Sequence, residues 1–241
     1  MENVNSISEW TFMNNNRTLI LNKDGEVFEF LLSKNDKSHE AEYKISKITD
    51  NVKQKQSFIA NVNRDFIDIT RLTEETQEAI RSLSTAGVLE GKSKSEFLPD
   101  KTIIRAEAAA ALLRIAGKEY NAEASFVDVN TEKWYYSIAG ASYKYGIVNG
   151  FGDNSFRGEE DISGLQFLAL AARVLRNESF SKITEATLKL PDSIPSWAAE
   201  DVSLAINEGL VTAEEAAELI GSENISRSKA AVLLYRLYGK I

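Results

Sequence analysis

The feature that most constrains this chain is an internal repeat that is present in three copies. A glycine that ends an apolar, helix-periodic segment recurs at nearly even intervals, at Gly87, Gly146 and Gly209. A second helical pattern opens at one and the same distance after each glycine, at Ile104, Ser163 and Ser226. Equal spacing in three copies indicates a tandem repeat, in which each helix pair buries its apolar face against its neighbours.

Each copy is expected to form a helix, a glycine-ended turn, a loop and a second helix. Glycine suits the residue after a helix because it adopts the left-handed conformation without a Cβ clash. We predict first helices at 74–86, 134–145 and 196–208. The predicted second helices, whose apolar residues recur at helical spacing, span 105–116, 165–176 and 227–238.

Residues 1–64 have a different pattern. The β-prone runs 17–21 and 26–30 flank Asn22-Lys23-Asp24-Gly25, and Asp-Gly favours a hairpin turn. We predict a small β domain here, or the end of one, followed by repeats at 66–117, 126–178 and 188–241. The expected fold class is therefore mainly α with a smaller β part.

Longer sequence motifs lie at corresponding positions in the three copies. The middle copy contains Phe126-Val127-Asp128-Val129, then Trp134, then the run 146–157, GIVNGFGDNSFR. The first copy closes with Ile103-Ile104-Arg105-Ala106-Glu107, and the third keeps Trp197 and Ile225-Ser226-Arg227. These residues resemble the S-layer homology family, whose repeat has Phe-x-Asp-Val, a tryptophan at a helix start, a glycine-rich loop and a closing Ile-Thr-Arg-Ala-Glu.

The resemblance implies an architecture and a function. It implies three helix-loop-helix repeats in a pseudo-threefold arrangement around a central three-helix bundle. It also implies a noncovalent anchor of a bacterial surface protein, which binds an anionic secondary cell-wall polysaccharide, often pyruvylated, in grooves between repeats. The expected location is extracellular, at the cell wall or S-layer, with self-assembly on the cell surface. The alternative is a degenerate scaffold that interacts with proteins and binds no glycan.

Two arginines carry the binding prediction. The resemblance assigns Arg105 and Arg227, at the starts of second helices, to the glycan, because an arginine fork suits a carboxylate and helix N–H groups add to an anion site. Pairing with acidic surface residues is an equal alternative for both. The middle copy has Gly164 at this position, so its groove should be weak unless Arg157 or Arg173 substitutes.

The start of the second helix also carries capping signals. Ser163 with Gln166 forms a capping-box pattern, Ser226 keeps only the cap, and Glu107 keeps only the acid. We interpret these four residues as structural.

The remaining candidates are aromatic or glycine residues. Trp134 and Trp197 lie at the same offset before the glycine of their copy. Each could stack on a sugar, but we favour a core position because tryptophan is highly buried on average. Gly150 and Gly152 are expected to form a tight loop beside the glycan.

Composition excludes several function classes. With 36 acidic and 28 basic residues, the net charge of −8 argues against nucleic-acid binding. The chain has no cysteine, no apolar run long enough for a membrane span, and no motif for a metal or cofactor. We expect no enzymatic activity, since the lone histidine, His39, lies in a polar run without a catalytic motif. No signal peptide is visible at the N-terminus, so an exported protein would require a longer precursor.

Overall fold

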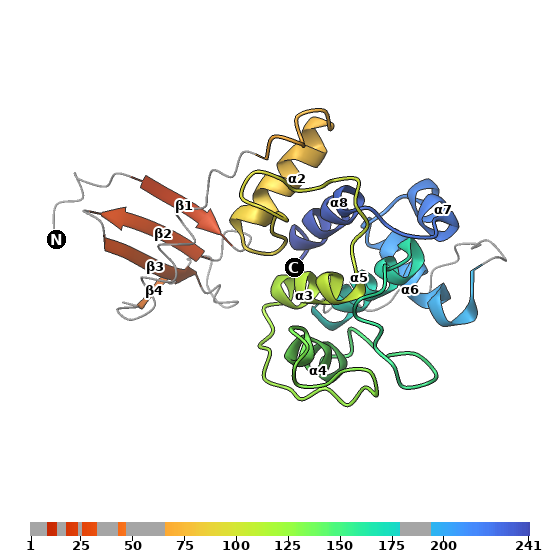
Figure 1. The fold of residues 1–241 in the computed structure, drawn as a ribbon. Coiled ribbons are helices and arrows are strands. Elements are labelled where there is room, and N and C mark those ends of the chain that lie inside the picture. Colours follow the sequence, from red (N-terminus) through yellow and green to blue (C-terminus); the bar gives the residue numbers. More distant parts are fainter. Residues whose placement is uncertain (1–8, 14–17, 24–25, 33–42, 47–65, 179–193) are drawn as a thin grey trace. The chain divides into compact units, whose positions relative to one another are not determined.

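A computed structural model describes residues 9–13, 18–23, 26–32, 43–46, 66–178 and 194–241 (Figure 1). The chain divides into two units, Met1–Arg64 and Asp65–Ile241, and each is described by itself.

The first unit contains an antiparallel sheet with strands in the order β1-β2-β3-β4. The strands are β1 Glu9–Met13, β2 Thr18–Lys23, β3 Glu26–Leu32 and β4 Tyr43–Ser46. In the β2–β3 register, Lys23 pairs with Glu26 and Leu21 pairs with Phe28. The predicted turn residues Asp24 and Gly25, together with His39, lie outside the described residues. That residues 1–64 form a folded domain of their own stays a prediction.

The second unit is helical. The described residues of this unit form seven helices: α2 Glu74–Thr85, α3 Arg105–Ile115, α4 Tyr136–Lys144, α5 Gly164–Glu178, α6 Ser196–Asn207, α7 Ala213–Gly221 and α8 Arg227–Tyr238. All six predicted helices are present, and their starts agree closely with the prediction. The described part of the chain is therefore mainly helical.

Left-handed glycines end the three first helices, as predicted. Gly87, Gly146 and Gly209 have φ angles of 66°, 68° and 62°. A residue with a Cβ would be strained at each of these positions. The repeat spacing in the sequence therefore reflects a backbone conformation that recurs in each copy.

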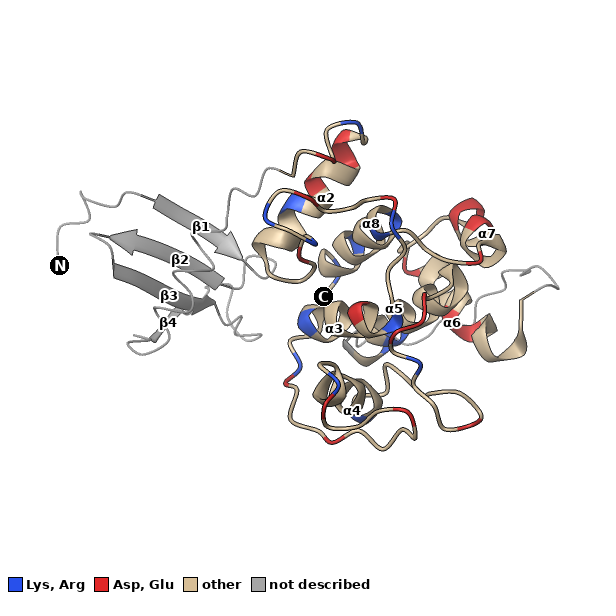
Figure 2. Cartoon of the chain, in the orientation of Figure 1, with Lys and Arg blue, Asp and Glu red and all other residues tan. Residues whose placement is uncertain are grey.

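Helix α7 was not predicted. It replaces the glycine-rich loop of the third copy and begins with a complete capping box, in which the Thr212 hydroxyl accepts from the Glu215 N–H and the Glu215 carboxylate accepts from the Thr212 N–H. The Thr-x-x-Glu pattern is itself a sequence signal for a helix start at this position. Acidic residues gather at the start of α7, as Figure 2 shows.

The helices pack in a repeating order. Each second helix contacts the first helix of another copy, as the pairs α3–α4, α5–α6 and α8–α2, and α3, α5 and α8 also contact one another. Close approach of α3 is possible because it is rich in small buried residues, namely Ala106, Ala108, Ala109, Ala110 and Ala111.

A closed ring of three backbone hydrogen bonds lies where the second helices begin. The Ile103 N–H donates to Ile225 O (3.2 Å), the Ile225 N–H to Ile162 O (3.0 Å), and the Ile162 N–H to Ile103 O (3.1 Å). All three isoleucines are buried. Each lies just before its second helix, so the ring holds the three helix starts next to one another.

The aspartates of the opening motif fix the loops of their own copies. Asp68 accepts from the backbone N–H groups of Phe97 (3.0 Å) and Leu98 (2.7 Å), while Asp128 accepts from those of Phe156 and Arg157 (both 2.7 Å). Leu98 and Arg157 have positive φ angles of 58° and 56°. Such a conformation costs energy in a residue with a Cβ and persists where surrounding contacts hold it.

Replacing Asp128 by Ala should therefore lower the free energy of unfolding by about 2 kcal/mol, since two backbone N–H groups lose a charged acceptor. Urea denaturation measures this loss. Asp128→Asn keeps one oxygen acceptor and should lose less. An alanine variant as stable as the wild-type protein would contradict this role.

Candidate functional site

A hollow of about 380 Å³ lies between the copies, and we call it the repeat 2 groove. Its walls come from the start of α3, the loop 149–152, one face of α5 and the start of α6. The lining residues are Arg105, Asn149, Gly150, Phe151, Gly152, Gln166, Ala169, Leu170, Arg173 and Trp197. The structure thus brings together four of the six predicted site residues, Arg105, Trp197, Gly150 and Gly152, and leaves Arg227 and Trp134 outside this groove.

The backbone at the start of α3 docks onto the loop of the second copy. The N–H groups of Arg105 and Ala106 donate to Glu160 O and Gly158 O, both at 2.9 Å. Carbonyl oxygens of the second copy thus already accept from these two N–H groups, so neither group is available to an anion.

Arg105 is a buried cation that forms no ion pair with the described residues. Its side chain enters the groove, yet the residue is only 6% exposed. The guanidinium carbon lies 4.9 Å from the Phe151 ring centroid and 5.8 Å from that of Phe156. Its Nε is buried without a hydrogen-bond partner, and no ion pair joins this guanidinium to any residue that the structure describes. Buried charges are normally paired, so this arrangement is the unusual feature of the site.

The electrostatic surroundings make the Arg105 charge less favourable still. Burial, followed by repulsion from Arg173 and Arg157, lowers the Arg105 pKa to about 10, and Glu160 acts in the opposite direction. Because this pKa lies below the value of 12.5 for a free side chain, the charge destabilises the folded chain at all pH values below about 10. A bound anion would offset that cost.

Two further arginines are held beside Arg105. Arg173 donates from Nε to Asp201 (3.0 Å) and from Nη1 to Ile147 O (3.4 Å). Arg157 contacts Asp153 (3.0 Å) and lines a second hollow of about 180 Å³ that also borders Arg105. The sequence names these two arginines as possible substitutes for the arginine that is missing at position 164, and the structure places both beside Arg105. They are the functional candidates that the sequence left unassigned.

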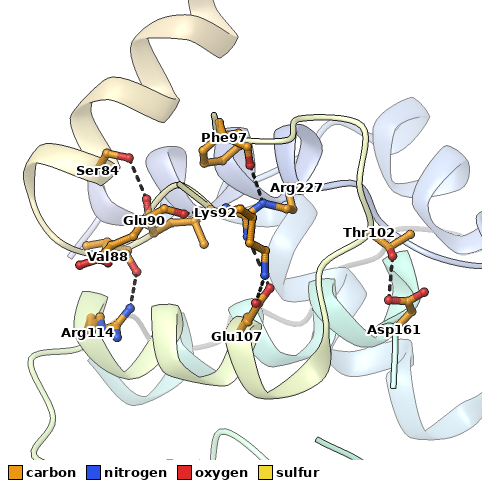
Figure 3. Close-up of polar contacts among 11 residues, drawn as sticks. Ser84, Val88, Glu90, Lys92, Phe97, Thr102, Glu107, Arg114, Asp161 and Arg227 are labelled. Carbon is orange, nitrogen blue, oxygen red and sulfur yellow. Dashed lines mark hydrogen bonds and ion pairs between the residues drawn. The ribbon is translucent and has the colours of Figure 1, made fainter. Parts of the chain in front are cut away.

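Arg227 is fully satisfied by the protein itself. It is 1% exposed and donates to Phe97 O (2.9 Å) and Glu90 O (2.6 Å), and its Nη1 lies 3.4 Å from a Glu107 carboxylate oxygen. Figure 3 shows Lys92 converging on the same carboxylate. This geometry favours the alternative interpretation, in which the arginine pairs with an acidic residue and joins the third copy to the first.

Both tryptophans contradict the preference for a core position. Trp134 is 57% exposed and Trp197 is 52% exposed. Trp197 is the second residue of α6 and lines the repeat 2 groove. Trp134 precedes α4 and stands edge-on to Tyr135, with ring centroids 5.4 Å apart. The two tryptophans hold the same position in their copies and are exposed to a similar degree. Position in the repeat therefore describes their exposure better than the average burial of tryptophan does.

The glycines of the groove differ in their roles. A Cβ on Gly150 would lie 2.5 Å from the Phe126 ring, and its φ is +76°, so this residue is needed for the tight loop. A Cβ on Gly152 would meet nothing within 4 Å. Gly152 therefore leaves open space at the rim of the groove.

The position of Gly164 is filled by α7. A Cβ there would lie 2.4 Å from Leu219 O and 2.4 Å from Ser222 Oγ. A separate hollow of about 420 Å³ borders α2, α7 and α8, and ion pairs cross it, with Arg236 bound to Glu75 and Glu215. Helix α7 therefore leaves no place for an arginine at position 164.

We predict different changes in the free energy of unfolding for two variants at equivalent positions of the repeat. Arg227→Met should lower the free energy of unfolding by about 3 kcal/mol, because Glu107 and two carbonyl groups lose a buried partner. Arg105→Met should cost nothing or add stability, since it removes an unpaired buried charge. Urea denaturation of both variants compares them, and equal losses would contradict the distinction.

Restoring an arginine at position 164 should not create a groove there. Gly164→Arg forces the side chain against α7, so we expect a loss of about 1–3 kcal/mol in unfolding free energy from overpacking. The measurement is again urea denaturation, with Gly152→Ala as the control at an open position. A Gly164→Arg variant as stable as the wild-type protein would contradict this prediction, because it would mean that α7 moves aside at little cost.

The described residues 66–178 and 194–241 thus define a helical-repeat protein with an open groove lined by cations. Within these residues, no helix has the length and apolarity needed to cross a membrane, and no cluster of acidic or histidine side chains is arranged to hold a metal ion.

Comparison with known proteins identifies the repeat. Residues 68–109 and 125–168 match the S-layer homology domain, so these two copies belong to the S-layer homology family. The third copy lies outside the matched residues.

The relatives include surface proteins and enzymes. An amylopullulanase of Thermoanaerobacterium thermosulfurigenes is 30% identical over 168 residues, which is 68% of this chain and 9% of that protein. A surface-layer 125 kDa protein of Lysinibacillus sphaericus is 26% identical over 70% of this chain and 14% of its own length. An exoglucanase XynX of Acetivibrio thermocellus is 28% identical over 68% of this chain and 15% of its length. The chain therefore spans only a small part of these relatives.

Proposed function

We propose that residues 66–241 form a pseudo-threefold module that anchors a bacterial surface protein noncovalently to the cell wall. In this proposal the repeat 2 groove binds an anionic secondary cell-wall polysaccharide, such as a pyruvylated one. The protein would act outside the cell, as part of a longer exported chain, and the module itself would not be catalytic.

The observation that carries the proposal is the buried Arg105 guanidinium, which has no ion pair among residues 66–178 and 194–241. A buried cation that lacks a protein counterion is stabilised by an anion from outside. Two more arginines, Arg157 and Arg173, add positive potential at the same point. Together they favour an anionic ligand over a neutral sugar.

The walls of the groove suit a charged glycan in particular. A guanidinium matches a carboxylate through two parallel N–H···O bonds. Trp197 presents an exposed indole to the groove, and such a ring packs on the apolar face of a sugar while its N–H donates to a hydroxyl. A ligand with a carboxylate on a sugar ring would use both groups at once.

The relatives are consistent with this function. Several are surface-layer proteins, and others are enzymes whose matched part is a minor share of their length. A module common to such different proteins fits a shared anchoring role better than a shared reaction. The activity of the whole protein to which this chain belongs is a separate matter.

The second candidate function is a scaffold that binds proteins and no glycan. The observation in its favour is that Arg227 is paired internally and that α7 fills the Gly164 position. Under this alternative, chains would assemble with each other and would not be retained by wall glycan.

Cosedimentation with purified cell-wall sacculi tests the proposal, and the two tryptophans provide a matched pair. Trp197→Ala should weaken binding about tenfold, which is the order expected for one lost stacking contact. Trp134→Ala is the control, because this residue is equally exposed but lies outside the repeat 2 groove, and it should bind as the wild-type protein does.

Chemical removal of the secondary polymer from the sacculi completes the test. Binding should disappear with the polymer and should fall with Arg105→Met. Binding that persists on stripped sacculi would overturn the proposal. Absence of binding combined with ordered oligomers in light scattering would support the scaffold alternative.

A further inference from the structure

The third residue of a second helix lies near the first residue of the second helix of another copy at two places in the structure. Glu107, Gln166 and Lys229 hold this third position, at the same offset after the glycine of their copy. Glu107 contacts Arg227, and Gln166 lines both hollows that border Arg105. Position three of one helix and position one of another therefore form an ion pair in one case and border the same hollows in a second.

The two arginines at these points have similar surroundings but different polar partners, since Arg227 also donates to two carbonyl oxygens. Both pack on a phenylalanine of the loop below them, with the guanidinium carbon of Arg227 4.6 Å from the Phe97 ring and that of Arg105 4.9 Å from the Phe151 ring. Both helix starts donate backbone hydrogen bonds to that loop, from Arg227 to Lys101 O at 2.8 Å and from Arg105 to Glu160 O at 2.9 Å. Of the two, Arg227 alone pairs with a carboxylate among the described residues.

We propose that position three of the second helix decides whether a groove accepts a ligand. Glu107 acts as an internal anion that closes the Arg227 position, and Gln166 leaves Arg105 free for a carboxylate from outside. An uncharged amide occupies a volume close to that of the acid but cannot neutralise the cation. In identifying the external carboxylate with a glycan, this inference rests on the proposed function.

The third pairing agrees with the same rule. Of the two residues that remain, Gly164 at position one offers no arginine and Lys229 at position three offers no acid. Lys229 instead pairs with Glu218 of α7. Each pairing thus has a different combination at the two positions, and Arg with Gln is the combination that leaves a free cation.

The test is Gln166→Glu in the full chain, measured first without any ligand. The new carboxylate should pair with Arg105 and raise the midpoint of thermal unfolding by about 3 °C. The Arg105 Nε–H signal in an arginine-labelled NMR spectrum should shift as well. Asn130→Asp is the control, since it adds the same charge at an exposed residue whose side-chain oxygen already accepts from the Glu132 N–H. It should change neither reading.

The second measurement adds sodium pyruvate as a small carboxylate probe, with sodium chloride at equal ionic strength as the reference. Pyruvate should move the Arg105 Nε–H signal of the wild-type chain and of Asn130→Asp, and it should leave that of Gln166→Glu in place. Retention on sacculi should fall at least tenfold in Gln166→Glu.

The outcomes separate this inference from the proposed function. An unchanged melting midpoint and an unmoved Arg105 signal in Gln166→Glu would overturn the inference, and so would a Gln166→Glu variant that still responds to pyruvate as the wild-type chain does. A wild-type chain that responds to pyruvate but is not retained on sacculi would refute the glycan and leave the role of position 166 intact.

Discussion

The ring of backbone hydrogen bonds among Ile103, Ile162 and Ile225 determines the rest of the helical unit. Its three buried N–H groups and three carbonyl groups satisfy one another, so each copy completes the hydrogen bonding of the next. Because the ring lies just before the second helices, it places all three helix starts at one point. A single copy could not close the ring, since each of the three copies supplies one isoleucine to it.

The ring also explains how unequal copies share one fold. The isoleucine backbone supplies the contact between copies, so the side chains just beyond it are free to vary. Arg227 with Glu107 makes a buried ion pair, Arg105 with Gln166 leaves a cation open, and Gly164 makes room for α7. Buried charge is costly without a partner, and these three arrangements are three responses to that cost. Only the second one calls for an anion from outside.

The sequence was sufficient for features that depend on local conformation. The glycines at the ends of the first helices and the apolar period of the second helices indicated the helices correctly. The sequence could not show which acid faces which arginine, because Glu107 and Arg227 are far apart along the chain and meet only through the packing of two copies. The exposure of Trp134 and Trp197 was misjudged for the same reason. Nothing in a local pattern says which side of a helix start another copy will cover.

The loops show which features a local sequence pattern predicts and which features depend on the folded chain. The Phe-x-Asp motif was recognised as a repeat marker, but its role in holding Leu98 and Arg157 at positive φ follows only from the folded chain. The sequence was sufficient to predict helix α7, since its capping box is a sequence signal. It was not sufficient to predict the open groove, because four separate segments of the chain form that groove.

The central claim is that one position in the three-copy ring presents a free cation to an anionic wall glycan. Its most direct test is the binding stoichiometry of the full chain, measured by isothermal titration calorimetry with polysaccharide fragments released from purified sacculi. We expect one fragment to bind per chain, with binding lost in Arg105→Met and retained in Trp134→Ala. Two or three equivalent sites per chain, or unchanged binding without Arg105, would contradict it.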